Sequence, residues 1–136
     1  MQEFRAGIAK VAPNSRILPL IFDSHGQCQR IGMFLHAIGY YCAYTGGIEW
    51  DNYEATTNYF PIMYKPALNS IRPNTGVIEG NPQNMDIASN VNLVDNICTW
   101  DMPLNSAIQQ RIEAHYELVF ERGRTRIYQR LETTPN

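Results

Sequence analysis

Two mostly apolar runs limit the folds that this sequence can adopt. The first extends from Ile17 to Phe22 and the second from Leu93 to Trp100. A strand reads as a continuous apolar run when both of its faces are covered, as in the parallel sheets of α/β proteins. Pro19 interrupts the first run, so this strand must lie at an edge of the sheet there or carry a bulge. We expect the two runs to lie side by side in one buried sheet.

A stretch without charged side chains, Ile31 to Ile48, indicates a buried helix above these strands. Its apolar residues repeat at helical spacing, which predicts a helix from about Gln27 to Tyr44 that ends at Gly46-Gly47. Four glycines, three tyrosines and one histidine make the stretch too polar for a membrane span. That histidine, His36, is expected to be a hydrogen-bonded core group, and the alternative is a side chain that faces a ligand.

Shorter patterns predict the remaining elements. They are a helix over 2–12, an irregular stretch over 48–81 with a short edge strand at 59–65 and a turn at 74–76, a short helix over 82–89, a helix that ends near His115, and a hairpin of 116–121 with 125–131. Gly123 supplies the positive φ that the hairpin turn needs. This order predicts one α/β domain over residues 1–136, a three-layer Rossmann-like arrangement whose mixed sheet ends in an antiparallel hairpin.

Composition supports one folded domain and excludes some classes of function. The chain has 136 residues, 44% of them apolar, which is enough for a single core. Its formal net charge of −2 excludes a nucleic-acid binder that depends on an excess of basic side chains. The first residues lack the apolar segment of a signal peptide. The three cysteines form no CxxC pair and no closed disulfide framework, and we expect them to be small buried groups.

The richest polar cluster follows the first strand, where ligands collect in open α/β sheets. There His25 could act as a base, Asp23 as the group that orients it, and Ser24 or Cys28 as a nucleophile. The alternative is that Asp23 or Ser24 caps the next helix and the rest is a solvated turn. Asp101 follows the second strand at the same predicted edge. The sequence contains no G-x-S-x-G, G-x-G-x-x-G or P-loop motif.

Aromatic side chains gather in the irregular middle of the chain. Aromatic side chains in such a segment have three alternative roles: to stack on sugar rings, to enter a membrane interface, or to fix the segment to the sheet. The residues are Trp50, Tyr53, Tyr59, Phe60 and Tyr64. The arginines of the hairpin are expected to pair across the strands, with contact to lipid headgroups as the alternative. No pattern of histidines or carboxylates indicates a metal or a cofactor, and Asp86 and Asp95 stand alone in the sequence.

Several segments occur in an order typical of one family. They are the stretch from Ala9 to Leu20, Phe34-Leu35-His36-Ala37, Tyr40-Tyr41, Gly46-Gly47, Leu93 to Ile97, Tyr116 to Glu121 and Arg126 to Arg130. Together they resemble the soluble C-terminal domain of bacterial polytopic membrane proteins of the glycosyltransferase type. In that pattern an Arg-x-Leu-Pro-Leu strand precedes a His-bearing helix that ends at Gly-Gly. The resemblance spans most of the chain, but the turn Asp23-Ser24-His25-Gly26 is not part of it.

The resemblance implies an extracytoplasmic, periplasmic domain that follows the membrane helices of a larger parent protein; a cytoplasmic location is the alternative. This chain would then be a fragment of that parent. In such enzymes the donor is a lipid-phosphate-linked sugar, and the catalytic carboxylate lies on a loop between membrane helices. No residue of this chain inherits that role, although His36 matches the histidine of the pattern.

We therefore expect a non-catalytic accessory domain that positions a sugar acceptor or a lipid-linked substrate. The candidate binding residues are His36, Trp50, Tyr53, Tyr59, Tyr64 and Asp101. The first alternative is a small hydrolase or transferase that uses the Asp23-Ser24-His25 turn, for which a nucleophile must lie within hydrogen-bond distance of His25. The second is a protein-interaction module, for which the sign is a large exposed apolar patch near the short edge strand.

Overall fold

The two apolar runs form neighbouring parallel strands, as predicted. The structure is a computed structural model that describes residues 2–25, 32, 34–50, 61 and 75–132. In it, β1 (Arg16–Ile21) pairs with β3 (Asn96–Trp100) from Ile17 opposite Asn96 to Ile21 opposite Trp100. All of β3 and all but the first residue of β1 are buried. Burial on both faces explains why these strands read as apolar runs rather than as alternating patterns.

The sheet has five strands in the order β2-β1-β3-β5-β4. The strand β2 (Ile48–Glu49) pairs in parallel with the start of β1, whereas β5 (Thr125–Arg130) is antiparallel to both β3 and β4 (Tyr116–Arg122). The described part of β2 pairs with Arg16 and Ile17, and the placement of Pro19 at an open edge stays a prediction. The fold is therefore mixed α/β, and the predicted mixed sheet with its closing hairpin is confirmed.

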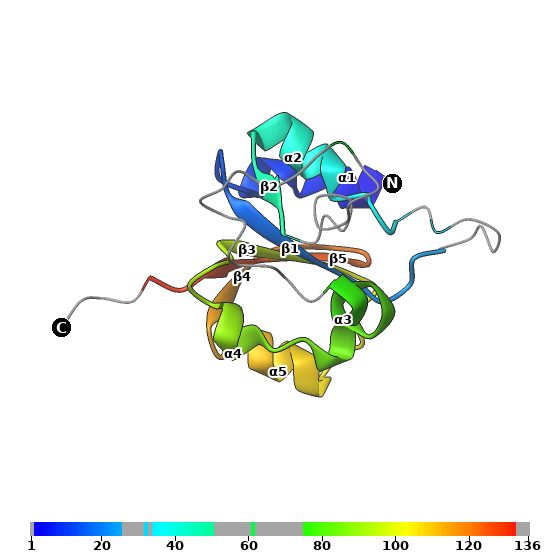
Figure 1. Ribbon diagram of the computed structural model, residues 1–136, viewed down its shortest axis with the longest axis vertical. Helices are drawn as coiled ribbons and strands as arrows, with labels where there is room; N and C mark the ends of the chain where they lie inside the picture. The colour runs from blue at the N-terminus through cyan, green and yellow to red at the C-terminus, as the bar shows by residue number, and fades with distance from the viewer. Residues whose placement is uncertain (1, 26–31, 33, 51–60, 62–74, 133–136) are drawn as a thin grey trace.

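Helices cover both faces of the sheet (Figure 1). On one face lie α1 (Gln2–Ala6), the 3-10 turn η1 (Ile8–Lys10) and α2 (Gly39–Thr45). On the other lie α3 (Thr75–Gly80), η4 (Pro82–Asn84), α4 (Ile87–Asn90) and α5 (Ala107–Glu113). Each face has its own apolar core, because successive residues of β1 point to opposite sides. No helix in the described part of the chain is long and apolar enough to cross a membrane.

The long helix predicted from Gln27 to Tyr44 is shorter than expected. Residues 34–38 form turns, α2 begins only at Gly39, and residues 26–31 and 33 lie outside the described part of the chain. The turns are closed by bonds to the third residue back, such as Ala37 N–H to the Phe34 carbonyl. Apolar spacing fits a series of turns as well as a helix, so it overestimated the length of the helix. The predicted end is correct, because Gly46 caps α2 with φ of 69°.

Three further local predictions need correction. Residues 75–80 form the helix α3 where a turn was predicted at 74–76, and residues 48–49 form the edge strand β2 where an irregular stretch was expected. The predicted helix over 82–89 is divided into η4 and α4, because Asp86 breaks the run and caps α4 through the backbone N–H of Ser89. The edge strand predicted at 59–65 falls outside the described residues, apart from Pro61.

The chain between α1 and η1 passes so close to the sheet that only glycine fits at position 7. A Cβ atom on Gly7 would lie 2.3 Å from Ile127 Cδ1 and 2.7 Å from the Tyr41 hydroxyl oxygen. Both side chains are fully buried, so neither moves away easily. We expect Gly7→Ala to lower the free energy of unfolding by about 1–2 kcal/mol, as other overpacked cores do.

Gly39 offers a matched control, because a Cβ atom there would meet nothing within 4 Å. As Gly39 is the first residue of α2, Gly39→Ala is expected to leave the stability unchanged or to raise it. Urea unfolding followed by circular dichroism compares the two variants. Equal effects of the two substitutions would contradict the close packing at Gly7.

Candidate functional site

The two turns at the carboxyl edge of the parallel strands are joined by one arginine. Asp23 follows β1 and Asp101 follows β3, and the guanidinium of Arg124 lies between them. Its Nη1 is 3.4 Å from Asp23 Oδ2 and its Nε is 3.6 Å from Asp101 Oδ1. Both aspartates were expected at this edge, and the hairpin arginines were expected to pair across the strands. Arg124, in the turn of the β4–β5 hairpin, instead pairs with these two aspartates. All three side chains remain substantially exposed, so these ion pairs contribute little stability.

The aromatic ring below Arg124 belongs to the core. The Arg124 guanidinium carbon lies 5.8 Å from the centre of the Trp100 ring, and Trp100 stacks on Phe34 at 4.1 Å. Asp101 has φ of 57°, a left-handed conformation that few non-glycine residues adopt. The Trp100 indole N–H and the Thr125 hydroxyl, which belong to cross-strand partners, are buried without a hydrogen-bond partner among the described residues. This edge therefore combines paired surface charges with a closely packed aromatic base.

The Asp23-Ser24-His25 turn does not have the geometry of a catalytic triad. Ser24 Oγ lies 3.2 Å from His25 Nδ1, but the two residues are neighbours in the chain and His25 is exposed. Asp23 Oδ1 accepts the backbone N–H of His25 at 3.1 Å, which closes the turn rather than orienting the imidazole. Cys28, the other proposed nucleophile, lies outside the described residues.

The other candidate binding residues do not come together in the described structure. His36 is exposed, so the prediction of a core imidazole is wrong: residues 34–38 form turns, and these leave the His36 side chain at the surface. Trp50 is only 1% exposed and packs in the core between β1 and α3 rather than on a surface. Tyr53, Tyr59 and Tyr64 lie outside the described residues.

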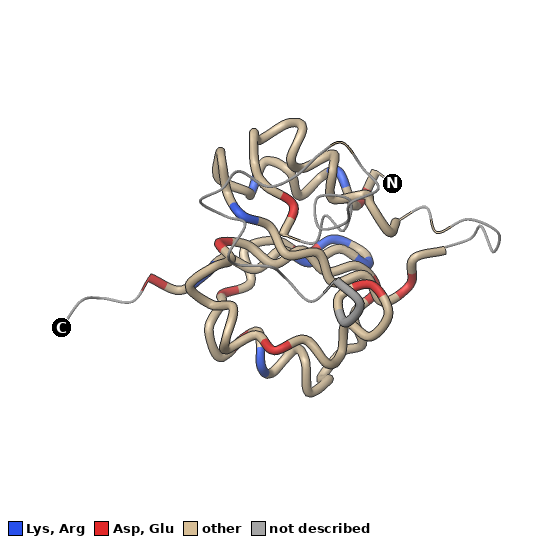
Figure 2. The backbone as a smooth tube through the Cα atoms, in the orientation of Figure 1, with Lys and Arg blue, Asp and Glu red and all other residues tan. Residues whose placement is uncertain are grey.

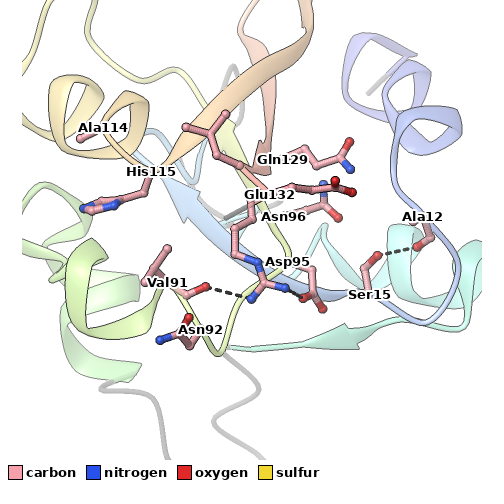
Figure 3. Close-up of a pocket in the computed structure, with 12 residues that line it drawn as sticks. Ala12, Ser15, Val91, Asn92, Asp95, Asn96, Ala114, His115, Gln129 and Glu132 are labelled. Atoms are coloured by element: carbon pink, nitrogen blue, oxygen red, sulfur yellow. Dashed lines mark hydrogen bonds and ion pairs between the residues drawn. The ribbon is translucent and has the colours of Figure 1, made fainter. Parts of the chain in front are cut away.

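A pocket of about 680 Å³ lies at the opposite, amino edge of β1 and β3 (Figure 3). Its size falls within the usual range for sites that bind small molecules. Residues from the starts of β1 and β3, the turn before β3, the end of α5 and the end of β5 line it. The lining residues are Ala12, Ser15, Val91, Asn92, Asp95, Asn96, Ala114, His115, Gln129, Arg130, Leu131 and Glu132.

Asp95 is the fixed charge at the base of this pocket. It accepts the backbone N–H of Arg16 at 2.9 Å, Arg16 Nε at 3.1 Å and Arg16 Nη2 at 2.9 Å. Arg130 Nη2 lies 3.1 Å from the same carboxylate, while Arg130 Nη1 donates to the Val91 carbonyl at 3.1 Å. Burial by itself raises the pKa of Asp95, but the hydrogen bonds and charge of Arg16 outweigh it and hold that pKa below its ordinary value. Asp95 is therefore an ionised hydrogen-bond acceptor.

Polar side chains around this fixed charge still have hydrogen-bonding capacity. The side chains of Asn92, His115, Gln129 and Glu132 form no hydrogen bond within the described part of the chain, and they line the same pocket as Asp95 (Figure 3). Together these four side chains provide both hydrogen-bond donors and hydrogen-bond acceptors. Val91, Ala114 and Leu131 add apolar surface to the same lining.

Sequence reasoning missed this pocket because its charged residues are far apart in the chain. Arg16 and Asp95 are separated by 79 positions; Arg16 is the first residue of β1, and Asp95 directly precedes β3. Opposite charges at the start of two strands that are predicted to be parallel neighbours are the signal that would have indicated the pair. No three His, Cys, Asp or Glu side chains in the described residues are grouped so that they could hold a metal ion.

The charge distribution over the described residues is also even. Lysine and arginine positions are scattered among the acidic ones along the chain and do not gather into one stripe (Figure 2).

Comparison with known proteins gives no match, since no protein-family model, no curated protein and no solved structure is significantly similar to this chain. The function must therefore be inferred from the chemistry of the two edges of the sheet.

Proposed function

We propose that this chain is a binding domain that holds a neutral, polyhydroxylated ligand of the sugar type in the pocket at the amino edge of the sheet. The observation that carries the proposal is the pocket itself: its volume is about 680 Å³, and its lining includes four polar side chains that form no hydrogen bond within the described part of the chain. Such a site recognises a ligand by hydrogen bonds from several directions.

The balance of charges favours a neutral ligand. The charged residues of the lining are one cation, Arg130, and two carboxylates, Asp95 and Glu132. Arg16, which is outside the lining, pairs with Asp95 and adds a second cation. Two cations and two anions cancel, so neither a strongly anionic nor a strongly cationic ligand gains from the site as a whole. Sugar hydroxyls both donate and accept, which matches carboxylates, amides and a guanidinium at once.

Binding without catalysis is the simpler reading of this chemistry. Asp95 is held ionised by two arginines, so it has no proton to give as a general acid. Its oxygens are occupied by Arg16 and Arg130, which leaves little basicity for proton abstraction. The carboxylate thus serves as a rigid acceptor that keeps the neighbouring donors in place.

The alternative functions have weaker support. For the hydrolase, Ser24 and His25 meet on an exposed turn, and Asp23 is engaged with the backbone and with Arg124. For the interaction module, the edge strand predicted at 59–65 lies outside the described residues, so its surface offers no argument.

The wider context of the domain is a proposal that rests on the sequence resemblance. We propose that the chain is an extracytoplasmic accessory domain of a membrane glycosyltransferase-like protein, packed near that parent's membrane helices, and that its fold is Rossmann-like with three layers. In that setting the bound sugar is an acceptor or the sugar part of a lipid-linked substrate. Membrane spans encoded in the same reading frame upstream of Met1 would support this setting, and an in-frame stop codon there would remove it.

Titration calorimetry with a panel of neutral sugars tests the binding proposal, with the corresponding sugar phosphates as a comparison. We expect at least one neutral sugar to bind, and Gln129→Ala to weaken it about fivefold, the cost of one hydrogen bond. Gln110→Ala is the matched control, because Gln110 is exposed on α5 and outside the pocket. Absence of binding to every sugar, or equal affinities for the two variants, would rule out this pocket as the sugar site.

A further inference from the structure

An exposed pair of tyrosines and an arginine form a patch on the outer side of α1 and α2. Tyr40 and Tyr44 lie one helical turn apart on α2 and are 46% and 64% exposed. The Arg5 guanidinium carbon lies 5.7 Å from the centre of the Tyr40 ring and 5.8 Å from that of Tyr44. Arg5 Nη2 also donates to the Tyr44 hydroxyl at 3.0 Å. We call these three residues the Arg–Tyr patch.

The Arg–Tyr patch is formed by two elements that the core holds together. Tyr41, between the two exposed tyrosines, is fully buried and donates its hydroxyl proton to the Phe4 carbonyl. The Phe4 and Tyr41 rings also pack edge to face at 5.1 Å. Because α1 and α2 are fixed to each other in this way, the patch is already ordered. Binding of a partner therefore costs little conformational entropy on the side of this protein.

Two exposed basic side chains lie on this side of the domain. Arg5 and Lys10 are exposed on α1 and η1, and α2 contains no charged residue. The exposed acid of α1, Glu3, is turned toward the hairpin, where its Oε2 lies 3.4 Å from the backbone N–H donor of Arg124. The charge in direct contact with the two tyrosine rings is therefore that of Arg5.

We propose that this side of the domain contacts an anionic lipid bilayer. Tyrosine prefers the headgroup level of a membrane, where its ring is partly buried and its hydroxyl stays hydrated. Lysine and arginine near an anionic bilayer add electrostatic attraction to lipid phosphates. Arg5 supplies such a charge against both tyrosine rings, and Lys10 adds an exposed one on η1, which packs against α2. The proposal is independent of the sugar pocket, because no residue of the patch lines it.

Vesicle flotation tests this proposal with the full chain and no sugar present. One set of vesicles contains phosphatidylcholine alone, and the other contains equal parts of phosphatidylcholine and phosphatidylglycerol. We expect the protein to float with the anionic vesicles and not with the neutral ones. Binding should weaken as salt is added, because the attraction between exposed charges and lipid phosphates is screened.

Two pairs of variants separate the patch from non-specific adsorption. Arg5→Gln is expected to reduce binding to the anionic vesicles about fivefold, the effect of one basic residue near a charged surface, whereas Arg122→Gln, at the exposed hairpin turn, should leave it unchanged. Tyr44→Ser should also weaken binding severalfold, whereas Leu104→Ser should not, although Leu104 is the more exposed of the two. Circular dichroism confirms that each variant is folded before flotation.

The possible results of the flotation experiment decide the proposal either way. Loss of binding in both patch variants, with both controls unaffected, supports a bilayer-contacting face. Equal binding of patch and control variants overturns it, because attachment would then depend on net charge alone. Failure of the unmodified protein to float with either vesicle also overturns it and leaves the patch as a surface for a protein partner or as packing between α1 and α2.

Discussion

Replacing Trp100 with alanine is expected to lower the free energy of unfolding by about 3–5 kcal/mol, the usual cost of removing a large buried aromatic side chain. Trp100 is only 5% exposed and ends the central strand β3. It stacks on Phe34 at 4.1 Å and meets Phe4 edge to face at 6.1 Å. The loss would leave a cavity between the sheet and the α1–α2 side, which those two phenylalanines fill only in part.

Urea unfolding followed by circular dichroism measures this effect, with Leu104→Ala as the control. Leu104 is 68% exposed, so its truncation should change the stability by less than about 0.5 kcal/mol. Small domains are stabilised by only about 5–15 kcal/mol in total, so the Trp100→Ala variant should unfold at a much lower urea concentration. If Trp100→Ala and Leu104→Ala unfolded at the same urea concentration, Trp100 would not be the core residue described above.

Replacing Asp95 with asparagine is expected to lower the free energy of unfolding by about 2–3 kcal/mol at neutral pH. Asparagine keeps the shape of the side chain but removes its charge and replaces one acceptor oxygen with a donor. Arg16 and Arg130 would then face each other without the carboxylate that joins them. The three segments that meet at this point are the starts of β1 and β3 and the end of β5.

The effect of Asp95→Asn should also depend on pH in a defined direction. The pKa of Asp95 is lower in the folded protein than the ordinary value of 3.8, so its charge stabilises the fold above that value. This contribution disappears as the pH falls through the lower pKa of the folded state. We therefore expect a large difference in stability between Asp95→Asn and the unmodified protein at neutral pH, and a smaller one below about pH 4.

Glu117→Gln provides the control for this pH series. Glu117 is exposed on β4 and forms no ion pair or side-chain hydrogen bond with a described residue, so its neutralisation should change the stability little at any pH. A constant difference between Asp95→Asn and the unmodified protein from neutral to acidic pH would show that the charge of Asp95 does not stabilise the fold. The same outcome would remove the physical basis for treating Asp95 as a fixed acceptor in the pocket.

The strands were predictable because their signal is local. Ile17 to Ile21 and Asn96 to Trp100 lie in runs whose burial on both faces demands apolar residues at nearly every position. The hairpin was predictable from the alternation on each side of Gly123, which has φ of 56°. The conformation of residues 34–38 was not predictable, because their apolar spacing fits both a helix and a series of turns, and packing decides between them.

The two charged sites also differ in how far the sequence predicts them. Asp23 and Asp101 could be placed at one edge because each ends a predicted strand, and neighbouring parallel strands end at the same side of a sheet. The partner that joins them, Arg124, comes from a hairpin more than twenty residues farther along the chain. The pocket around Asp95 needs the strand register as well, because only that register sets Arg16 beside it.

The fold class, the pairing of two buried strands and the closing hairpin were predictable, since they follow from apolar patterns within short stretches of chain. Which charges meet depends on the folded arrangement: Asp95 meets Arg16 and Arg130 at one edge, and Asp23 and Asp101 meet Arg124 at the other. The physical reason is range. Burial patterns act between residues a few positions apart, whereas an ion pair depends on the relative placement of whole elements, which no single stretch of sequence encodes.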